Sequence, residues 1–205
     1  MTDMGAFRDA VADWAAGGSG GPAGELAGQL RVRTAVLLEG PSDLAAVEAL
    51  AARRGRDLPA EGVCVIPMGG AMNVGRYAGL LGPPGLGLRL AGLCDEGEQG
   101  YYDRGLERAR APREGVFVCA TDLEDELIRA LGVERVEEVV RAEGDLPAWR
   151  IFGRQPAQQD RSPEQRMRRF LGTKKGRKIR YGRVLVEALD LDRVPAPLHD
   201  LLAHV

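Results

Sequence analysis

Aromatic residues and long apolar runs are both scarce in this chain of 205 residues. Phenylalanine, tryptophan and tyrosine make up 5% of the sequence, although hydrophobic residues of all kinds reach 44%, so we expect one substantial core of aliphatic side chains. No stretch approaches the ~20 consecutive apolar residues that cross a bilayer, and no charged-then-apolar signal peptide opens the sequence. We therefore expect a cytoplasmic protein with no membrane partner.

Zinc-binding and nucleotide-binding signatures are also missing. Cys64, Cys94 and Cys119 lie in or beside strand-like runs without the paired spacing of zinc ligands, which predicts three buried reduced thiols. The two histidines lie near the C-terminus, far from any cysteine cluster. A Gly-x-x-x-x-Gly-Lys-Ser/Thr loop is absent as well, so we expect neither a zinc site nor an ATP site in this chain.

Charge is distributed unevenly, although the net charge is only −2. The segment from Arg150 to Arg183 holds twelve basic residues against two acidic ones, which leaves the rest of the chain acidic. An acidic body beside a basic segment suits a metal site that receives a polyanion, whereas a solvated basic surface is the plainer interpretation. Few aromatic residues lie near the basic segment, so base stacking is not an expected way of binding nucleic acid.

Short apolar runs alternate with amphipathic stretches through most of the chain. Strands are predicted at residues 35–38, 62–67, 88–94 and 115–120, and helices follow them at residues 44–52, 73–81, 99–110 and 122–131. This alternation predicts an α/β fold with a mainly parallel sheet flanked by helices. We expect an N-terminal helix and Gly-rich linker in residues 1–30, a core in residues 31–145, and a basic, mostly helical C-terminal extension in residues 146–205.

Two segments within these regions are predicted to be irregular. Gly17 to Gly24 is rich in glycine and serine, which is typical of a flexible linker. Gly172 to Lys178 combines glycine with lysine and arginine and predicts a basic loop.

Acidic residues follow three of the four predicted strands. Glu39 ends the first strand and Asp95 the third, while Asp122 and Glu124 come directly after the fourth. Sites in α/β sheets form outside the carboxyl ends of the strands. We therefore expect these acids to lie at the same edge of the sheet. Oxygen ligands without histidine or cysteine favour Mg²⁺ or Mn²⁺ over zinc.

The first of these strand ends carries a second carboxylate. Ser42 is a suitable N-cap for the following helix, which places Asp43 in the first helical turn and close to Glu39. Two carboxylates held together are unfavourable unless a proton or a divalent cation neutralises them. The pair is therefore a further indication of a metal site.

Four pieces of the sequence together resemble the TOPRIM domain in the form found in nucleases of the OLD (overcoming lysogenization defect) family. They are Leu37-Leu-Glu-Gly-Pro-Ser-Asp43, Pro67-Met-Gly-Gly70, Leu93-Cys-Asp95 and Asp122-Leu-Glu124. The most specific piece is Glu-Gly-x-Ser-Asp after a strand. The resemblance covers about residues 33–190. It implies a Rossmann-like fold whose acidic cluster binds divalent metal, with two ions expected, for phosphodiester chemistry on DNA.

The resemblance also assigns roles to particular residues. Four acids match the metal ligands of the family, with Asp122 as an alternative to the last of them: Glu39, Asp43, Asp95 and Glu124. A lysine that stabilises charge on the phosphate or the leaving oxygen matches Lys178 best, with Lys174 and Lys175 as the nearest rivals. Lys178, Glu39 and Asp95 form the expected catalytic set. Contacts to the nucleic-acid backbone are expected from Arg166, Arg169, Lys174, Lys175, Arg177 and Arg180.

The chain departs from the family pattern in two ways. Most TOPRIM domains carry an aspartate two residues after the acid of the third strand, where this chain has Gly97. Glu98, or as a second choice Glu96, would then complete the site. OLD proteins usually carry an ATPase domain, which this chain is too short to contain, so a separately encoded ATPase is a candidate partner.

Three hypotheses for the function follow. The favoured one is a Mg²⁺- or Mn²⁺-dependent endonuclease acting on DNA, with a homodimer as a candidate assembly. A non-catalytic nucleic-acid-binding or regulatory module is the first alternative, because Gly97 removes one acid. A primase-like nucleotidyltransferase is less favoured, since the sequence has no zinc-ribbon cysteines for binding a template.

Overall fold

The strands form one parallel sheet in the computed structural model of the protein, which describes residues 4–205 apart from the side chain of Lys175. In sheet order they are β2 (Val63–Pro67), β1 (Thr34–Leu38), β3 (Arg89–Asp95) and β4 (Val116–Cys119). All pairings are parallel, with Leu38 opposite Pro67 on one side and opposite Leu93 on the other. The predicted α/β fold is confirmed.

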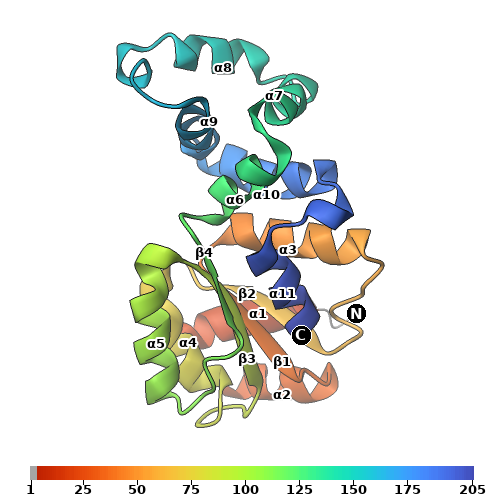
Figure 1. Ribbon diagram of the computed structural model, residues 1–205. Coiled ribbons are helices and arrows are strands. Elements are labelled where there is room, and N and C mark those ends of the chain that lie inside the picture. Colours follow the sequence, from red (N-terminus) through yellow and green to blue (C-terminus); the bar gives the residue numbers. More distant parts are fainter. Residues whose placement is uncertain (1–3) are drawn as a thin grey trace.

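Helices cover both faces of this sheet (Figure 1). One face is covered by α1 (Met4–Ala15), α2 (Gly21–Gln29), α4 (Val74–Leu81) and α5 (Gln99–Arg108). The other is covered by α3 (Pro41–Arg53), α6 (Leu123–Leu131), α10 (Lys175–Ala188) and α11 (Ala196–His204). Because side chains alternate along a strand, Ala35 and Leu37 join the first core while Val36 and Leu38 join the second.

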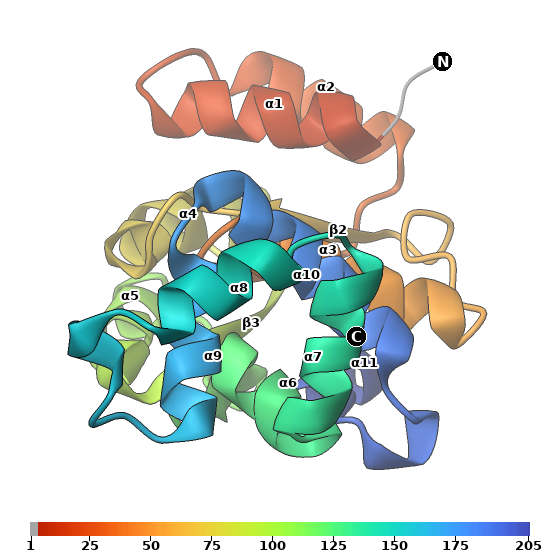
Figure 2. The same ribbon diagram turned by 90° about the horizontal axis from the view of Figure 1, so that it is seen from above.

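A further layer of helices extends from the second face. It consists of α7 (Val133–Ala142), α8 (Leu146–Gly153) and α9 (Pro163–Gly172), which lie beyond α6 and α10 (Figure 1). Val136, Trp149 and Met167 from these helices belong to the same buried cluster as the residues of α3. Seen from above, α7, α8 and α9 lie on the near side, while α1 and α2 run side by side at one edge (Figure 2). The predicted helical C-terminal region is therefore confirmed.

Two helices differ from the elements predicted from the sequence: α2 lies where a flexible linker was expected, and α8 is an additional helix. Helix α2 begins at Gly21, inside the expected flexible linker, because Ala23 and Ala27, one turn apart, are buried in the first core. Packing of this small-residue face outweighs the poor helix propensity of glycine. Helix α8 was not predicted; it has a proline in its first turn and is anchored by the buried Trp149.

The expected basic loop is largely helical. Helix α9 ends at Gly172 and α10 begins at Lys175, so Lys178 lies on a helix. Tyr181 and Leu185 of this helix are fully buried. An apolar face that packs on the core stabilises α10 against the low propensity of its glycines.

Helix α10 meets the start of α3 at a glycine. A Cβ at Gly182 would lie 2.4 Å from the carbonyl oxygen of Ser42, whereas a Cβ at Gly176 of the same helix would meet nothing within 4 Å. We therefore expect Gly182→Ala to lower the free energy of unfolding by about 1–3 kcal/mol through overpacking. The matched Gly176→Ala should raise it by up to about 1 kcal/mol. Urea denaturation measures both, and equal effects would contradict the close contact.

Two predictions made from missing sequence features can be compared with the structure. Across the residues that are described, no helix combines the length and apolar character needed to span a membrane. The three cysteines are free and buried, as predicted. Burial raises the pKa of Cys64 to about 11 and that of Cys94 to about 12, so these thiols stay protonated at neutral pH and are poor nucleophiles.

Candidate metal centre

Glu39 and Asp95 lie side by side because β1 and β3 are neighbouring parallel strands in register. Leu38 pairs with Leu93, so both strands finish at the same edge of the sheet. The backbone of Glu39 is held by the glycine turn after β2, since its carbonyl accepts a 2.9 Å hydrogen bond from the N–H of Gly70. Gly70 has a φ of 125°, which other residues rarely adopt. This turn therefore fixes the end of β1.

A third carboxylate reaches this edge from the 3₁₀ turn that follows β3 (Glu96–Glu98). Glu39, Asp95 and Glu98 each place one carboxylate oxygen so that these oxygens all lie within 4.8 Å of one another. All three residues, here called the acidic centre, are half-buried. Among the described residues, the Oε2 atom of Glu98 is buried without a hydrogen-bond partner, so it is available to a cation, a proton or a water molecule.

The acidic centre is repulsive when no cation is bound. Burial, followed by the charges of Asp122 and Glu39, raises the pKa of Asp95 to about 7. Burial and the neighbouring Glu39 likewise raise the pKa of Glu98 to about 7. At neutral pH these groups are therefore divided between protonated and charged forms, and a cation would favour the charged form.

The donor set fits a hard divalent cation. The acidic centre contains carboxylates and neither histidine nor cysteine, which suits Mg²⁺ or Mn²⁺ better than zinc. The unpartnered oxygen of Glu98 adds an available ligand. The acidic centre could therefore bind a metal ion.

Asp43 faces the same edge but also has a structural role. Its carboxylate accepts a 3.0 Å hydrogen bond from the N–H of Gly40. Gly40, and not Ser42 as predicted, is the N-cap of α3, because the proline between them suits the first helical position. Burial raises the pKa of Asp43, and Glu39 adds to the rise while Lys178 opposes it. Asp43 is thus within electrostatic reach of the acidic centre without belonging to it.

Asp122 and Glu124 both have basic partners. Asp122 caps α6 by accepting a 2.8 Å hydrogen bond from the N–H of Asp125, and its other oxygen lies 2.6 Å from Nε of Arg168. Glu124, with 6% of its side chain exposed, lies 3.3 Å from Nζ of Lys178. The structure therefore brings all the predicted acids toward one edge, but pairs these two with protein cations.

The Lys178–Glu124 pair determines the charge at this side of the site. Burial raises the pKa of Glu124 to about 7, although Lys178 lowers it in part. Burial disfavours the charged ammonium and by itself lowers the pKa of Lys178. The nearby carboxylates of Glu124 and Asp43 outweigh burial, so the pKa is raised. Lys178 is therefore a cation at neutral pH, with Glu124 and Asp43 as its acidic neighbours.

Two of the predicted nucleic-acid-binding arginines form ion pairs with acids of the protein itself. Arg177 Nε lies 3.3 Å from a carboxylate oxygen of Asp145, and its side chain is only 8% exposed. Arg180 also binds Asp145, which accepts a third contact, of 3.2 Å, from the hydroxyl of Tyr181. Arg177 joins the start of α8 to α10 through its pair with Asp145, so it could contact nucleic acid only by giving up Asp145. Sequence reasoning missed Asp145, although two arginines three residues apart on one helix were a usable sign of a shared acidic partner.

The other predicted basic residues occupy different environments. Arg169 and Lys174 are exposed, and their side chains make no hydrogen bond or ion pair within residues 4–205. Arg166 is partly buried, with its Nε atom unpartnered. The side chain of Lys175 lies outside the described part of the structure. Sequence reasoning did not single out Arg168, which the structure places on Asp122.

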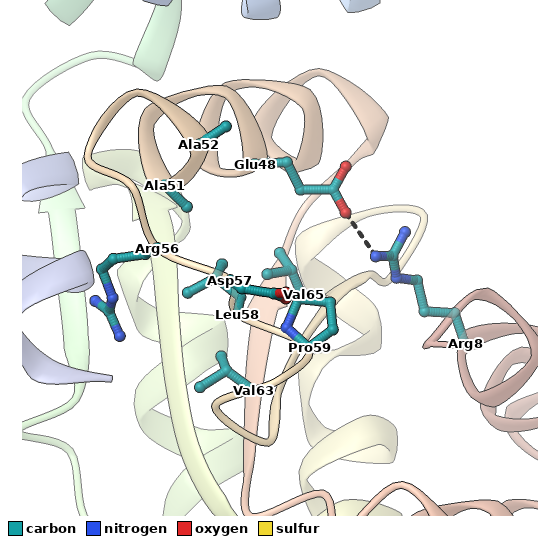
Figure 3. A pocket seen from close by; sticks show the side chains of 10 residues that line it. All are labelled: Arg8, Glu48, Ala51, Ala52, Arg56, Asp57, Leu58, Pro59, Val63 and Val65. Atoms are coloured by element: carbon teal, nitrogen blue, oxygen red, sulfur yellow. Dashed lines mark hydrogen bonds and ion pairs between the residues drawn. The ribbon is translucent and has the colours of Figure 1, made fainter. Parts of the chain in front are cut away.

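A separate hollow of about 380 Å³ lies along β2 and α3 (Figure 3). Arg8 of α1 reaches across one side of it to Glu48 of α3, and Arg56 pairs with Glu61. Asp57 accepts a hydrogen bond from a neighbouring backbone N–H. Because its charged side chains are paired in this way, the hollow is a weaker candidate for chemistry than the acidic centre.

Gly97 lies in the turn that carries Glu98, and a Cβ there would meet nothing within 4 Å. We expect Gly97→Asp to tighten Mn²⁺ binding by about 10-fold, because it adds a carboxylate beside the acidic centre. Isothermal titration with Mn²⁺ measures the change. Gly97→Asn, which adds similar volume without charge, should leave the affinity near that of the unaltered protein. Equal affinities for the two variants would show that residue 97 faces away from the ion.

Comparisons with known proteins give matches in sequence and in structure. Residues 32–96 match the family described as "Overcoming lysogenization defect protein-like, TOPRIM domain". The C-terminal region of the Burkholderia pseudomallei OLD protein is similar in structure, with a TM-score of 0.64 and 21% identity over 84% of this chain and 96% of that one. Comparison with curated protein sequences gives no match.

Two structures of the C-terminal region of the Xanthomonas campestris pv. campestris OLD protein are also similar. The one phased with mercury has a TM-score of 0.62 and covers 84% of this chain and 94% of that one, at 27% identity. The one phased with iodine has a TM-score of 0.64 and covers 84% and 93%, also at 27% identity.

The sequence match and the structural matches together cover the acidic edge of the sheet. Residues 32–96 contain β1, the glycine turn after β2, and two residues of the acidic centre, Glu39 and Asp95. The structural matches extend over most of the chain. This protein therefore contains an OLD-like TOPRIM domain and shares the fold of the C-terminal regions of OLD proteins.

Proposed function

We propose that this protein is a Mg²⁺- or Mn²⁺-dependent nuclease that hydrolyses phosphodiester bonds in DNA. The observation that supports this most directly is the convergence of three carboxylate oxygens within 4.8 Å at the ends of two neighbouring strands, with Lys178 nearby. The presence of an OLD-like TOPRIM domain agrees with this activity, since metal-dependent phosphodiester chemistry is what the family resemblance implies.

The acids divide into two groups for holding metal. Glu39, Asp95 and Glu98 would hold one ion, because their oxygens already converge. Asp43, Asp122 and Glu124 are the residues that would hold a second, and the last two would then have to exchange the partners they now bind. A bound ion would lower the pKa of the attacking water and neutralise charge that develops on the phosphate.

Lys178 has a separate role in the proposed reaction. Water attacks phosphorus, the bond from phosphorus to the leaving oxygen breaks, and negative charge grows on that oxygen. The ammonium of Lys178, held 3.3 Å from Glu124 and still 40% exposed, can stabilise this charge or donate a proton to the oxygen. Glu124 thus positions the lysine until substrate arrives.

DNA would approach over the helical layer. The side chains of Arg169 and Lys174 are exposed and free of partners in residues 4–205, so they are available to contact phosphates without reading sequence. We also propose, on the family resemblance alone, that an ATPase encoded by another chain cooperates with this protein.

Nicking of supercoiled plasmid tests the nuclease proposal. Purified protein should convert supercoiled plasmid to open-circular or linear forms when Mg²⁺ or Mn²⁺ is present, and EDTA should stop the reaction. The same preparation should be titrated with Mn²⁺ by calorimetry. Metal binding without nicking would reject the nuclease and support the binding or regulatory module. Absence of both would reject the metal centre itself.

A further inference from the structure

A hollow of about 450 Å³ adjoins the acidic side of the site, and it contains an aromatic ring. Its lining includes the acidic Glu124, the basic Lys178, Arg168 and Arg169, and the ring of Phe152 from α8. Small-molecule sites in proteins typically measure roughly 300–1,000 Å³, so the hollow has room for one nucleotide. Its contact with both Glu124 and Lys178 makes it continuous with the proposed reaction site.

The hollow can accept an anion because its own carboxylates are already neutralised. Asp122 is paired with Arg168, and Glu124 with Lys178. The side chain of Arg169 is exposed and makes no hydrogen bond or ion pair within residues 4–205. Its guanidinium is therefore free to bind a phosphate in the hollow.

The ring of Phe152 is held in place by two other aromatic rings. It stacks on Trp149 with ring centroids 6.2 Å apart and planes at 24°, and packs at 5.7 Å against Phe170. Trp149 is itself fixed by a 2.9 Å hydrogen bond from its indole N–H to Glu137. Phe152 is only half-buried, so an immobilised aromatic surface remains available on the hollow.

We propose that this hollow holds one unstacked nucleotide of a DNA strand, with its base against Phe152 and its phosphate on Arg169. The inference rests on the proposed nuclease function and specifies its substrate class. A base inside an intact duplex is covered on both faces by its neighbours, so it cannot contact a side chain in this way. The protein therefore engages DNA where a base is unpaired: in a single strand, in a flap or an end, or in a segment of supercoiled duplex that opens transiently.

The strongest test compares strands with and without bases. A single-stranded oligonucleotide carrying 2-aminopurine reports stacking by fluorescence quenching, and an abasic oligonucleotide of equal length presents the same phosphates. With Ca²⁺ as the probe metal, Phe152→Ala should weaken binding of the base-bearing strand by about 5- to 100-fold and relieve the quenching. Binding of the abasic strand should change less than about twofold, since its phosphates contact other residues.

Two further variants control for the structure of α8. Ile151, the neighbour of Phe152 on that helix, is 67% exposed, and Ile151→Ala should leave both affinities unchanged. Phe152→Tyr should restore base-dependent binding, because it returns an aromatic face. Equal loss for both strands in Phe152→Ala would overturn the inference, and so would the lack of any loss.

The outcome is separable from that of the plasmid experiment. Base-dependent binding without nicking would support the nucleotide site and reject the nuclease. Nicking by a protein whose binding ignores the bases would support the nuclease and reject the nucleotide site.

Discussion

Glu39→Gln is expected to reduce metal-dependent nicking of supercoiled plasmid on the order of 10³-fold, because metal catalysis supplies several kcal/mol of transition-state stabilisation. Glu39 contributes one of the three converging oxygens of the acidic centre. Glutamine keeps the size and an oxygen but removes the charge that holds a hard cation. Initial nicking rates at saturating Mn²⁺ measure the effect.

The matched control is Glu96→Gln. Glu96 follows Asp95 in the same turn but is exposed and lies outside the acidic centre. Its replacement removes the same charge from nearly the same place, so a rate within about twofold of the unaltered protein is expected. A similar loss in both variants would show that the region's overall charge matters and that Glu39 has no special role.

Mn²⁺ is expected to raise the melting temperature far more at about pH 8 than at about pH 5.5. The pKa values of Asp95, Glu98 and Glu124 are raised to about 7, first by burial. The folded protein thus binds more protons than the unfolded chain between about pH 4.5 and pH 7, so its stability falls as pH rises through this window. The metal-free protein should therefore melt roughly 5 °C lower at the higher pH.

Metal binding reverses this loss because it needs the carboxylates charged. A cation that binds only the folded state adds stability, and protons compete with it at the lower pH. Differential scanning fluorimetry with EDTA or Mn²⁺ at both pH values measures the four melting temperatures. Glu98→Gln should lose part of the Mn²⁺ effect, and Glu96→Gln should keep it. An equal Mn²⁺ effect at both pH values would argue against binding at the acidic centre.

Strand positions could be predicted because local pattern and packing agree. The run Thr34–Leu38 is buried throughout, and it is apolar from Ala35 onward, as is typical of strands covered on both faces. The glycine-rich and basic segments were harder to predict, because composition suggested irregular structure at Gly21 and at Lys175. Contacts with distant parts of the chain supply the stability of α2 and α10, and local sequence does not contain those contacts.

The acids of the candidate site could be predicted from the sequence, whereas their cationic partners could not. Strand ends identified Glu39 and Asp95, since parallel strands bring their carboxyl ends to one edge. Glu98 was preferred as the replacement for an acid at Gly97, and the structure places it with the other two. The partners of Asp122 and Glu124 could not be derived, because Arg168 and Lys178 lie more than forty residues away in the chain.

The sequence by itself determined the parallel α/β architecture and the set of acids at the strand ends, because strand periodicity and the direction of the chain are local properties. Tertiary structure alone decided which acids converge and which are neutralised by cations. It also decided that Phe152, from a helix the sequence did not predict, lines the same hollow as Lys178. Distances between side chains depend on how whole helices pack, and packing is a property of the complete fold.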